Sequence, residues 1–92
     1  MKLTQEQVIE LWREEEIEVN GITLTVVEVG DFEQDGKYQY ADIIFTDGFK
    51  HYRTYITRSG SPFTDWVYVD YGDAVIDEVE KREVTVTRWV SV

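Results

Sequence analysis

Apolar and polar residues alternate on both sides of Asp47-Gly48, which predicts a β-hairpin over Tyr38–Thr57 at the centre of the chain. Asp-Gly favours a tight turn because both residues tolerate the positive φ that such a turn needs. A two-residue turn would also set the register of the two strands. The expected cross-strand pairs are Thr46–Phe49, Ile44–His51, Asp42–Arg53 and Tyr40–Tyr55 on one face, with Ile43–Tyr52 and Ala41–Thr54 on the other. An aromatic pair and an opposite-charge pair support this register.

The stretch Thr4–Glu16 has the periodicity of an amphipathic helix. Its apolar positions follow helical spacing and are Val8, Ile9, Leu11 and Trp12. Thr4 is the expected N-cap, and Gln7 stands where it would complete a capping box. Leu3 and Val8 occupy the two positions of a hydrophobic staple.

The pattern after the helix predicts further strands. Ile17–Val29 has the alternation of a hairpin that turns at Asn20-Gly21. Phe63–Tyr71 is aromatic and β-branched, which is typical of a strand, and Glu83–Val92 alternates as a final strand. Gly72–Arg82 fits both two turns of helix and a strand, and we favour the extended form.

Two segments carry loop signals. Gly30–Gly36 is polar and acidic, and Arg58–Pro62 contains Ser-Gly-Ser-Pro. The predicted fold class is therefore α+β, mostly β: an N-terminal helix packed on a five- to six-stranded antiparallel sheet within a single domain, 1–92. An unpaired apolar edge, at Glu83–Val92 or Phe63–Tyr71, is a place where a homodimer could form.

Composition narrows the function classes. The 92 residues contain no cysteine, and no apolar run reaches the ~18 residues of a membrane span. The polar start Met1–Gln7 does not resemble a signal peptide. We therefore expect a cytoplasmic protein with no membrane partner.

The charge is the unusual feature, with 19 acidic and 9 basic residues and a net charge of -10. The acids concentrate in residues 6–35 and 65–80, while residues 37–58 and 81–92 are slightly basic. Direct nucleic-acid binding is disfavoured, because few cations are available to replace phosphate counterions. A partner with a basic surface is the alternative to a merely solubilising charge.

Chemistry-bearing motifs are sparse. His51 is the single histidine, it lies in the predicted hairpin, and no nucleophile motif accompanies it, so we expect no enzyme activity and no cofactor. Asp31, Glu33, Asp35 and Gly36, with Asp42 at the twelfth position, partly match a Ca²⁺-binding EF-hand loop. The predicted strands on both sides argue against that match, and an acidic β-turn is the alternative.

Two groups of carboxylates remain as candidate partner-binding residues. The first comprises Glu14, Glu15, Glu16 and Glu18. The second comprises Asp70, Asp73, Asp77, Glu78 and Glu80, with Asp65 nearby. Acids at the C-terminal end of the predicted helix oppose the helix dipole, at about 0.3–1 kcal/mol each, so fold stability does not require them. Closely spaced carboxylates can occupy a groove lined by lysine and arginine and steer a basic partner.

Two stretches, Arg58–Trp66 (RSGSPFTDW) and Glu78–Val90 (EVEKREVTVTRWV), resemble small uncharacterised proteins of bacteriophage origin. The resemblance implies a host-cell context in which small acidic phage proteins bind and inhibit a host protein, some of them by imitating DNA charge. We therefore expect a DNA-mimic protein that binds the basic nucleic-acid-binding surface of a host protein. The alternative is a small structural or assembly protein, such as a virion component or homo-oligomer, with no inhibitory role.

Overall fold

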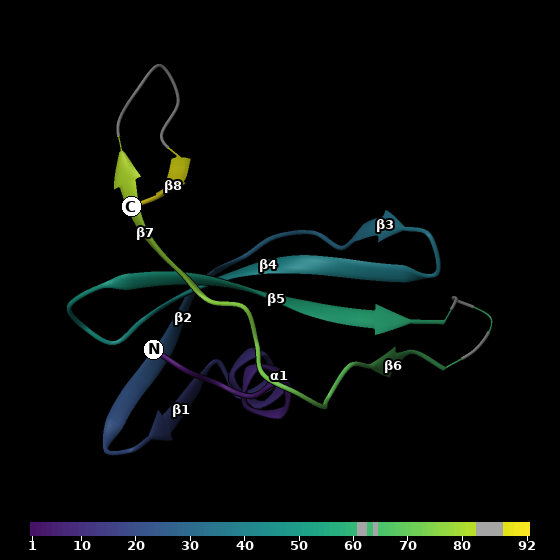
Figure 1. Ribbon diagram of the computed structural model, residues 1–92, viewed down its shortest axis with the longest axis horizontal. Helices are drawn as coiled ribbons and strands as arrows, with labels where there is room; N and C mark the ends of the chain where they lie inside the picture. The colour runs from purple at the N-terminus through teal and green to yellow at the C-terminus, as the bar shows by residue number, and fades with distance from the viewer. Residues whose placement is uncertain (61–62, 64, 83–87) are drawn as a thin grey trace.

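The computed structural model describes residues 1–60, 63, 65–82 and 88–92, and within them one helix packs on an antiparallel sheet (Figure 1). The elements are α1 (Gln5–Glu14), β1 (Glu16–Val19), β2 (Ile22–Val29), β3 (Glu33–Asp35), β4 (Tyr38–Thr46), β5 (His51–Ser59), β6 (Val67–Tyr68), β7 (Asp77–Arg82) and β8 (Arg88–Ser91). The strand order is β1-β2-β4-β5-β7-β8, with β3 also paired to β4 and β6 also paired to β5. The predicted fold class is confirmed, with eight described strands in place of five to six.

The β4–β5 hairpin is the centre of the sheet, as predicted. The two strands pair along their whole length. The outer edge of β4 is divided between β2, at residues 43–46, and β3, at residues 38–40. The outer edge of β5 is divided between β7, at residues 51–53, and β6, at residues 58–59. Four shorter strands are therefore positioned by one long hairpin.

The predicted register of this hairpin is wrong by two residues, since Thr46 faces His51 and not Phe49. The observed pairs are Phe45–Tyr52, Ile44–Arg53, Ile43–Thr54, Asp42–Tyr55, Ala41–Ile56 and Tyr40–Thr57. Because side chains alternate with a period of two, this shift leaves the residues that remain in β4 and β5 on their predicted faces. The Tyr40 and Tyr55 rings still meet along a diagonal, 6.3 Å apart at 75°.

A four-residue loop, Asp47–Lys50, causes the shift. The Asp47 carboxylate accepts hydrogen bonds from the backbone N–H groups of Phe49 (2.9 Å) and Lys50 (2.8 Å). The Thr46 hydroxyl donates to the Lys50 carbonyl (2.7 Å) and accepts from the N–H of Gly48 (3.0 Å), whose φ is 97°. These side-chain bonds replace the last strand pair, and Phe49 is left 93% exposed in the loop.

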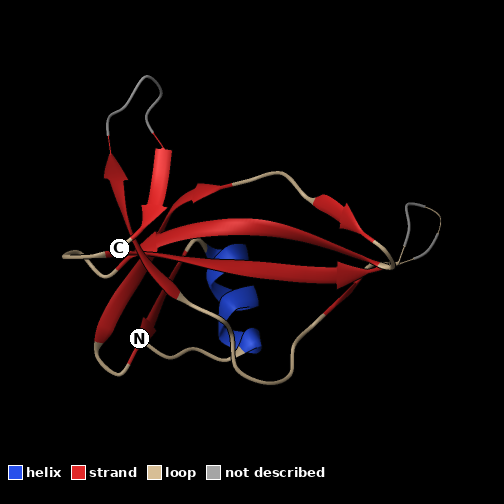
Figure 2. Ribbon diagram, turned by 45° about the horizontal axis from the view of Figure 1, so that its top comes forward, coloured by secondary structure: helices blue, strands red, loops and turns tan. Residues whose placement is uncertain are grey.

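Helix α1 begins as its sequence predicts. Thr4 and Gln7 form the reciprocal capping box, with bonds of 2.9 and 3.2 Å. Both predicted staple residues, Leu3 and Val8, are buried. The helix lies against one face of the sheet (Figure 2). The core between them comprises Leu3, Val8, Ile9, Leu11, Ile17, Leu24, Ala41, Ile43, Phe45 and Ile56.

The β1–β2 hairpin turns at Asn20-Gly21, as predicted. Val19 pairs with Ile22, and the two turn residues have φ values of 52° and 80°. Positive φ at both positions is what a two-residue primed turn requires. Farther along, a register irregularity between Val26 and Glu28 interrupts the pairing of β2 with β4.

Two predictions on the remaining segments are corrected. The expected loop Gly30–Gly36 contains strand β3, because Gly36, at φ 61°, allows a tight turn back into β4. Among the described residues of the expected strand Phe63–Tyr71, a ladder forms at Val67–Tyr68. Two aromatic side chains of this segment also pack against other residues, Trp66 against Arg58 and Tyr68 against Trp12.

The last predictions concern the C-terminal part. Gly72–Arg82 is extended, as favoured, and becomes strand β7 from Asp77. The predicted strand Glu83–Val92 is present as β8 at Arg88–Ser91, while residues 83–87 lie outside the described residues.

Candidate functional site

The first group of predicted partner-binding residues lies where α1 passes into β1. Glu14 ends the helix, Glu15 is its C-cap, and Glu16 and Glu18 belong to β1. All four side chains are exposed. We call these four residues the acidic edge, because β1 is at the edge of the sheet.

Glu15 adopts a backbone conformation that ordinarily favours glycine or asparagine. Its φ of 65° is left-handed, which lets its N–H bond to the Leu11 carbonyl at 2.8 Å and its carbonyl accept from Val26 at 2.9 Å. A side chain in this region costs about 1–2 kcal/mol relative to the right-handed form. The helix end therefore carries a glutamate where both backbone geometry and helix dipole favour another residue.

The acidic edge turns a corner of the molecule. Ile17 points into the core beneath the helix, so Glu16 and Glu18 lie on the opposite face of β1, beside Thr25 and Thr23. On the helix side the acidic surface continues through two exposed residues, Glu6 and Glu10, which stand eight and four residues before Glu14. The sequence prediction had left these two out of the group, although their spacing places them on one helical stripe with Glu14.

No cation of the described residues pairs with the acidic edge. None of its four carboxylates forms an ion pair within that part of the chain. The nearest base in sequence, Arg13, lies over the Tyr68 ring, 5.5 Å from its centroid. The negative charge of the edge is thus open to solvent.

The second predicted group is distributed over separate places. Asp73 forms a β-bridge with Thr4 beside the N-terminal end of α1, and Asp70 lies exposed shortly before it. In β7, Asp77 pairs with Arg53 in the ladder, whereas Glu78 lies on the other face and makes an ion pair with Lys50 at 3.6 Å. Glu80, partly buried, shares the face of Glu78. The structure therefore brings the first group together and does not gather the second into one surface.

His51 is part of a packed aromatic contact. Its ring is half-buried and lies 5.0 Å from the Trp89 ring of β8, tilted by 35°. Next to it, Arg53 donates a hydrogen bond to the Ser91 hydroxyl at 3.2 Å. These contacts fix the β7–β8 hairpin against β5.

The partial match to a Ca²⁺-binding EF-hand loop, at residues 31–42, receives no support from the geometry. Glu33 and Asp35 lie along a regular ladder opposite Tyr40 and Tyr38, so they do not converge on one point. Within the described residues, no three histidine, cysteine, aspartate or glutamate side chains gather as metal ligands.

Asp47 shows a clear electrostatic effect of the fold. The N–H groups of Lys50 and Phe49 stabilise its carboxylate and hold its pKa below the ordinary value. The Tyr52 hydroxyl also donates to it, at 3.1 Å, and burial raises the pKa of that tyrosine. The Asp47 carboxylate therefore stabilises the loop of the central hairpin.

Comparison with known proteins places the chain in a family. The family model described as "Phage T4 Y04K protein" matches residues 1–92, so the chain belongs to that family, and the expected resemblance to small phage proteins is confirmed. No curated protein and no solved structure matched the chain. No helix in the described part of the chain has the length and hydropathy needed to cross a membrane.

Proposed function

We propose that this member of the Phage T4 Y04K family is a small acidic binding protein that occupies the basic nucleic-acid-binding surface of a host protein and inhibits it. The acidic edge is the contact surface, and the acids of the second group, notably Asp70 and Asp73, add long-range attraction. The observation that carries the proposal is the exposure of four carboxylates within five residues, 14–18, without any ion pair among the described residues.

The spacing of the carboxylates supports DNA-like recognition. Along α1, acids four residues apart are separated by about 6 Å, and along β1, Glu16 and Glu18 are about 7 Å apart. One strand of duplex DNA presents a charge about every 3.4 Å along its axis. The acidic surface thus repeats at roughly the spacing of every second phosphate, which suits a groove lined by lysine and arginine.

The cost in stability also supports the proposal. Glu15 combines left-handed backbone with an unfavourable position in the helix dipole. Neither feature improves folding, and selection for binding explains why such residues persist at a functional surface. A charge needed only for solubility would have no reason to occupy this position.

The test is a pull-down from bacterial lysate with tagged protein, eluted along a salt gradient. The matched variants are Glu16→Lys/Glu18→Lys in the acidic edge and Glu28→Lys/Asp31→Lys outside it, which change the net charge equally at exposed positions. We expect a nucleic-acid-binding protein that is released as the Debye length falls from about 10 Å at 0.1 M to about 3 Å at 1 M salt. Loss of this partner with the first variant and retention with the second supports the proposal, and equal behaviour of both variants contradicts it.

A second candidate function is structural assembly, and the exposed apolar side chains on residues 63–75 favour it. Phe63 is 97% exposed, Tyr71 76% and Val75 68%. Exposed apolar side chains that gather into one patch are typical of an interface, and this alternative requires that these three do so. This alternative predicts a homo-oligomer that persists at high salt, whereas a monomer in light scattering would contradict it.

A further inference from the structure

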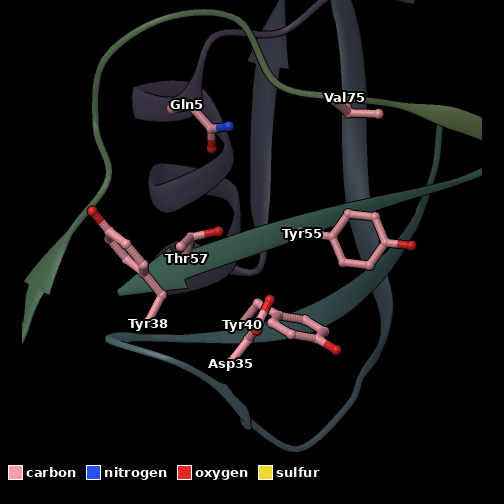
Figure 3. A pocket seen from close by; sticks show the side chains of 7 residues that line it. All are labelled: Gln5, Asp35, Tyr38, Tyr40, Tyr55, Thr57 and Val75. Carbon is pink, nitrogen blue, oxygen red and sulfur yellow. The ribbon is translucent and has the colours of Figure 1, made fainter. Parts of the chain in front are cut away.

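A cavity lies beside the central hairpin, and its lining contains none of the four residues of the acidic edge. Its volume is about 390 Å³, and its lining residues are Gln5, Asp35, Tyr38, Tyr40, Tyr55, Thr57 and Val75 (Figure 3). Residues from the helix, the β3–β4 hairpin, β5 and the chain before β7 therefore meet at one place.

The cavity wall combines aromatic rings with hydrogen-bond acceptors. Tyr40 and Tyr55 are 6.3 Å apart at 75°, so their rings form two nearly perpendicular walls. Asp35 stands next to Tyr40 in Figure 3 and contributes a carboxylate. The side-chain oxygen of Gln5 is buried and accepts no hydrogen bond within the described residues.

The charged lining of the cavity is acidic. Among the described residues, the lining contains one carboxylate and no lysine or arginine. A hydrogen bond with Glu33 and the charges of Glu33, Asp35 and Asp42 raise the pKa of Tyr40, so the potential at its hydroxyl is negative. Such a site repels phosphates and carboxylates and attracts cations.

We propose that this cavity binds an arginine side chain of a protein partner. Tyrosine faces attract a guanidinium through the ring quadrupole, and arginine makes such contacts more often than lysine. The N–H donors of the guanidinium match the carboxylate that Asp35 contributes to the lining. At the small end of the range for ligand sites, roughly 300–1,000 Å³, the volume suits one side chain rather than a nucleotide.

The chain itself already contains this mode of recognition. The guanidinium of Arg58 lies 3.7 Å from the Phe32 ring centroid and 4.0 Å from that of Trp66. There the chain supplies the cation, whereas the tyrosine cavity has the rings and the carboxylate without one. The proposed function supplies only the source of the arginine, namely a basic partner, and the affinity of the cavity can be measured without that partner.

The test is a titration of the wild-type protein with N-acetyl-argininamide, followed by backbone amide NMR. N-acetyl-citrullinamide, which has the same shape and no charge, is the matched ligand control. We expect saturable shifts at Asp35, Tyr38, Tyr40, Tyr55 and Thr57 with the arginine compound only. No saturation, equal shifts with citrulline, or shifts centred on the acidic edge would overturn the proposal, and none of these results decides whether the acidic edge binds a partner.

Matched variants separate the cavity from general charge attraction. Tyr55→Leu removes a ring of the cavity, and we expect it to weaken binding at least about fivefold, whereas Tyr71→Leu, at an exposed tyrosine outside the cavity, leaves binding unchanged. Asp35→Asn should weaken binding more than Asp31→Asn, although both remove one negative charge from the same segment. Tyr55→Phe should retain binding because the ring face remains. Equal affinities within both matched pairs would contradict the proposal even where the shifts are localised.

Discussion

Arg58 and the acidic edge are two charged regions that the chain treats in opposite ways. Arg58 is enclosed by its own protein: its guanidinium stacks on Phe32 and Trp66 and donates two hydrogen bonds to the Gln39 side-chain oxygen, at 3.1 and 2.8 Å. The acidic edge has four exposed carboxylates with no ion pair in the described part of the chain. One region stabilises the fold, whereas the other exposes its charge to solvent.

Three other basic residues also make contacts away from the acidic edge. Arg13 lies over Tyr68, Lys50 pairs with Glu78, and Arg53 bonds to Ser91. In a chain with 9 bases and 19 acids, cations used in this way cannot neutralise the acidic edge. The bases named here therefore stabilise the fold, while the acidic edge keeps its negative charge without an ion pair among the described residues.

The largest expected effect is on Arg58. Arg58→Ala removes two charge-assisted hydrogen bonds and two ring contacts, so we expect the free energy of unfolding to fall by about 2 kcal/mol. Arg13→Ala removes a single, longer ring contact of an exposed side chain and should cost under about 0.5 kcal/mol. Urea unfolding of both variants measures the difference, and equal losses would show that Arg58 is no more integrated into the fold than Arg13.

Replacing Glu15 in the acidic edge should raise the free energy of unfolding, whereas replacing Arg58 should lower it. Glu15→Gly relieves the left-handed backbone and the clash with the helix dipole, so we expect unfolding to require about 0.5–1 kcal/mol more. Glu14→Gly, one residue earlier and inside the helix, should instead lower stability by about 0.5–1 kcal/mol. If Glu15→Gly also lowers stability in urea unfolding, the edge is a stabilising feature and the comparison fails.

Salt should stabilise the protein by a smaller amount. Because repulsion among unpaired acids opposes folding, raising NaCl from 0.02 to 0.5 M should increase the free energy of unfolding by roughly 0.5 kcal/mol. The Glu16→Lys/Glu18→Lys variant should show less of this increase. An increase of the same size in both proteins would mean that the repulsion is not localised at the edge.

The smallest expected effect is on Asp47, whose carboxylate accepts hydrogen bonds within the loop of the central hairpin. Its pKa in the folded protein is lowered, so its contribution to stability is complete above the unfolded value of about 3.9 and is lost as the pH falls through the lowered folded value. Between pH 5 and pH 2.5, the wild type should therefore lose more stability than Asp47→Asn. Parallel losses in urea unfolding at the two pH values would contradict this role of the carboxylate.

Local sequence signals predicted most of the fold. The capping box at Thr4 and the turn at Asn20-Gly21 depend on neighbouring residues, and both were found where the pattern placed them. The central hairpin was also found, but its register was not, because the side chain of Asp47 extends the loop. The prediction of a strand over Phe63–Tyr71 was largely wrong because a contact between residues distant in sequence decides the local structure. Trp66 packs against the Arg58 guanidinium and is not part of a strand.

The two candidate surfaces differ in the same way in how far the sequence predicts them. The acidic edge could be predicted because its four glutamates lie within five residues, across the junction of helix and strand. The tyrosine cavity could not, because Gln5, Tyr55 and Val75 are brought together only by the packing of β5 against the helix and the chain before β7. No periodicity or motif connects them, although three tyrosines in two paired strands were visible.

The most direct test of the central claim is competition between this protein and DNA for the captured host partner. A fluorescent DNA duplex bound to that partner is titrated with the wild-type protein and with the Glu16→Lys/Glu18→Lys and Glu28→Lys/Asp31→Lys variants. We predict that the wild type and the second variant displace the duplex completely, and that the first variant does not. A ternary complex of partner, DNA and wild-type protein would contradict the claim that the acidic edge occupies the nucleic-acid-binding surface.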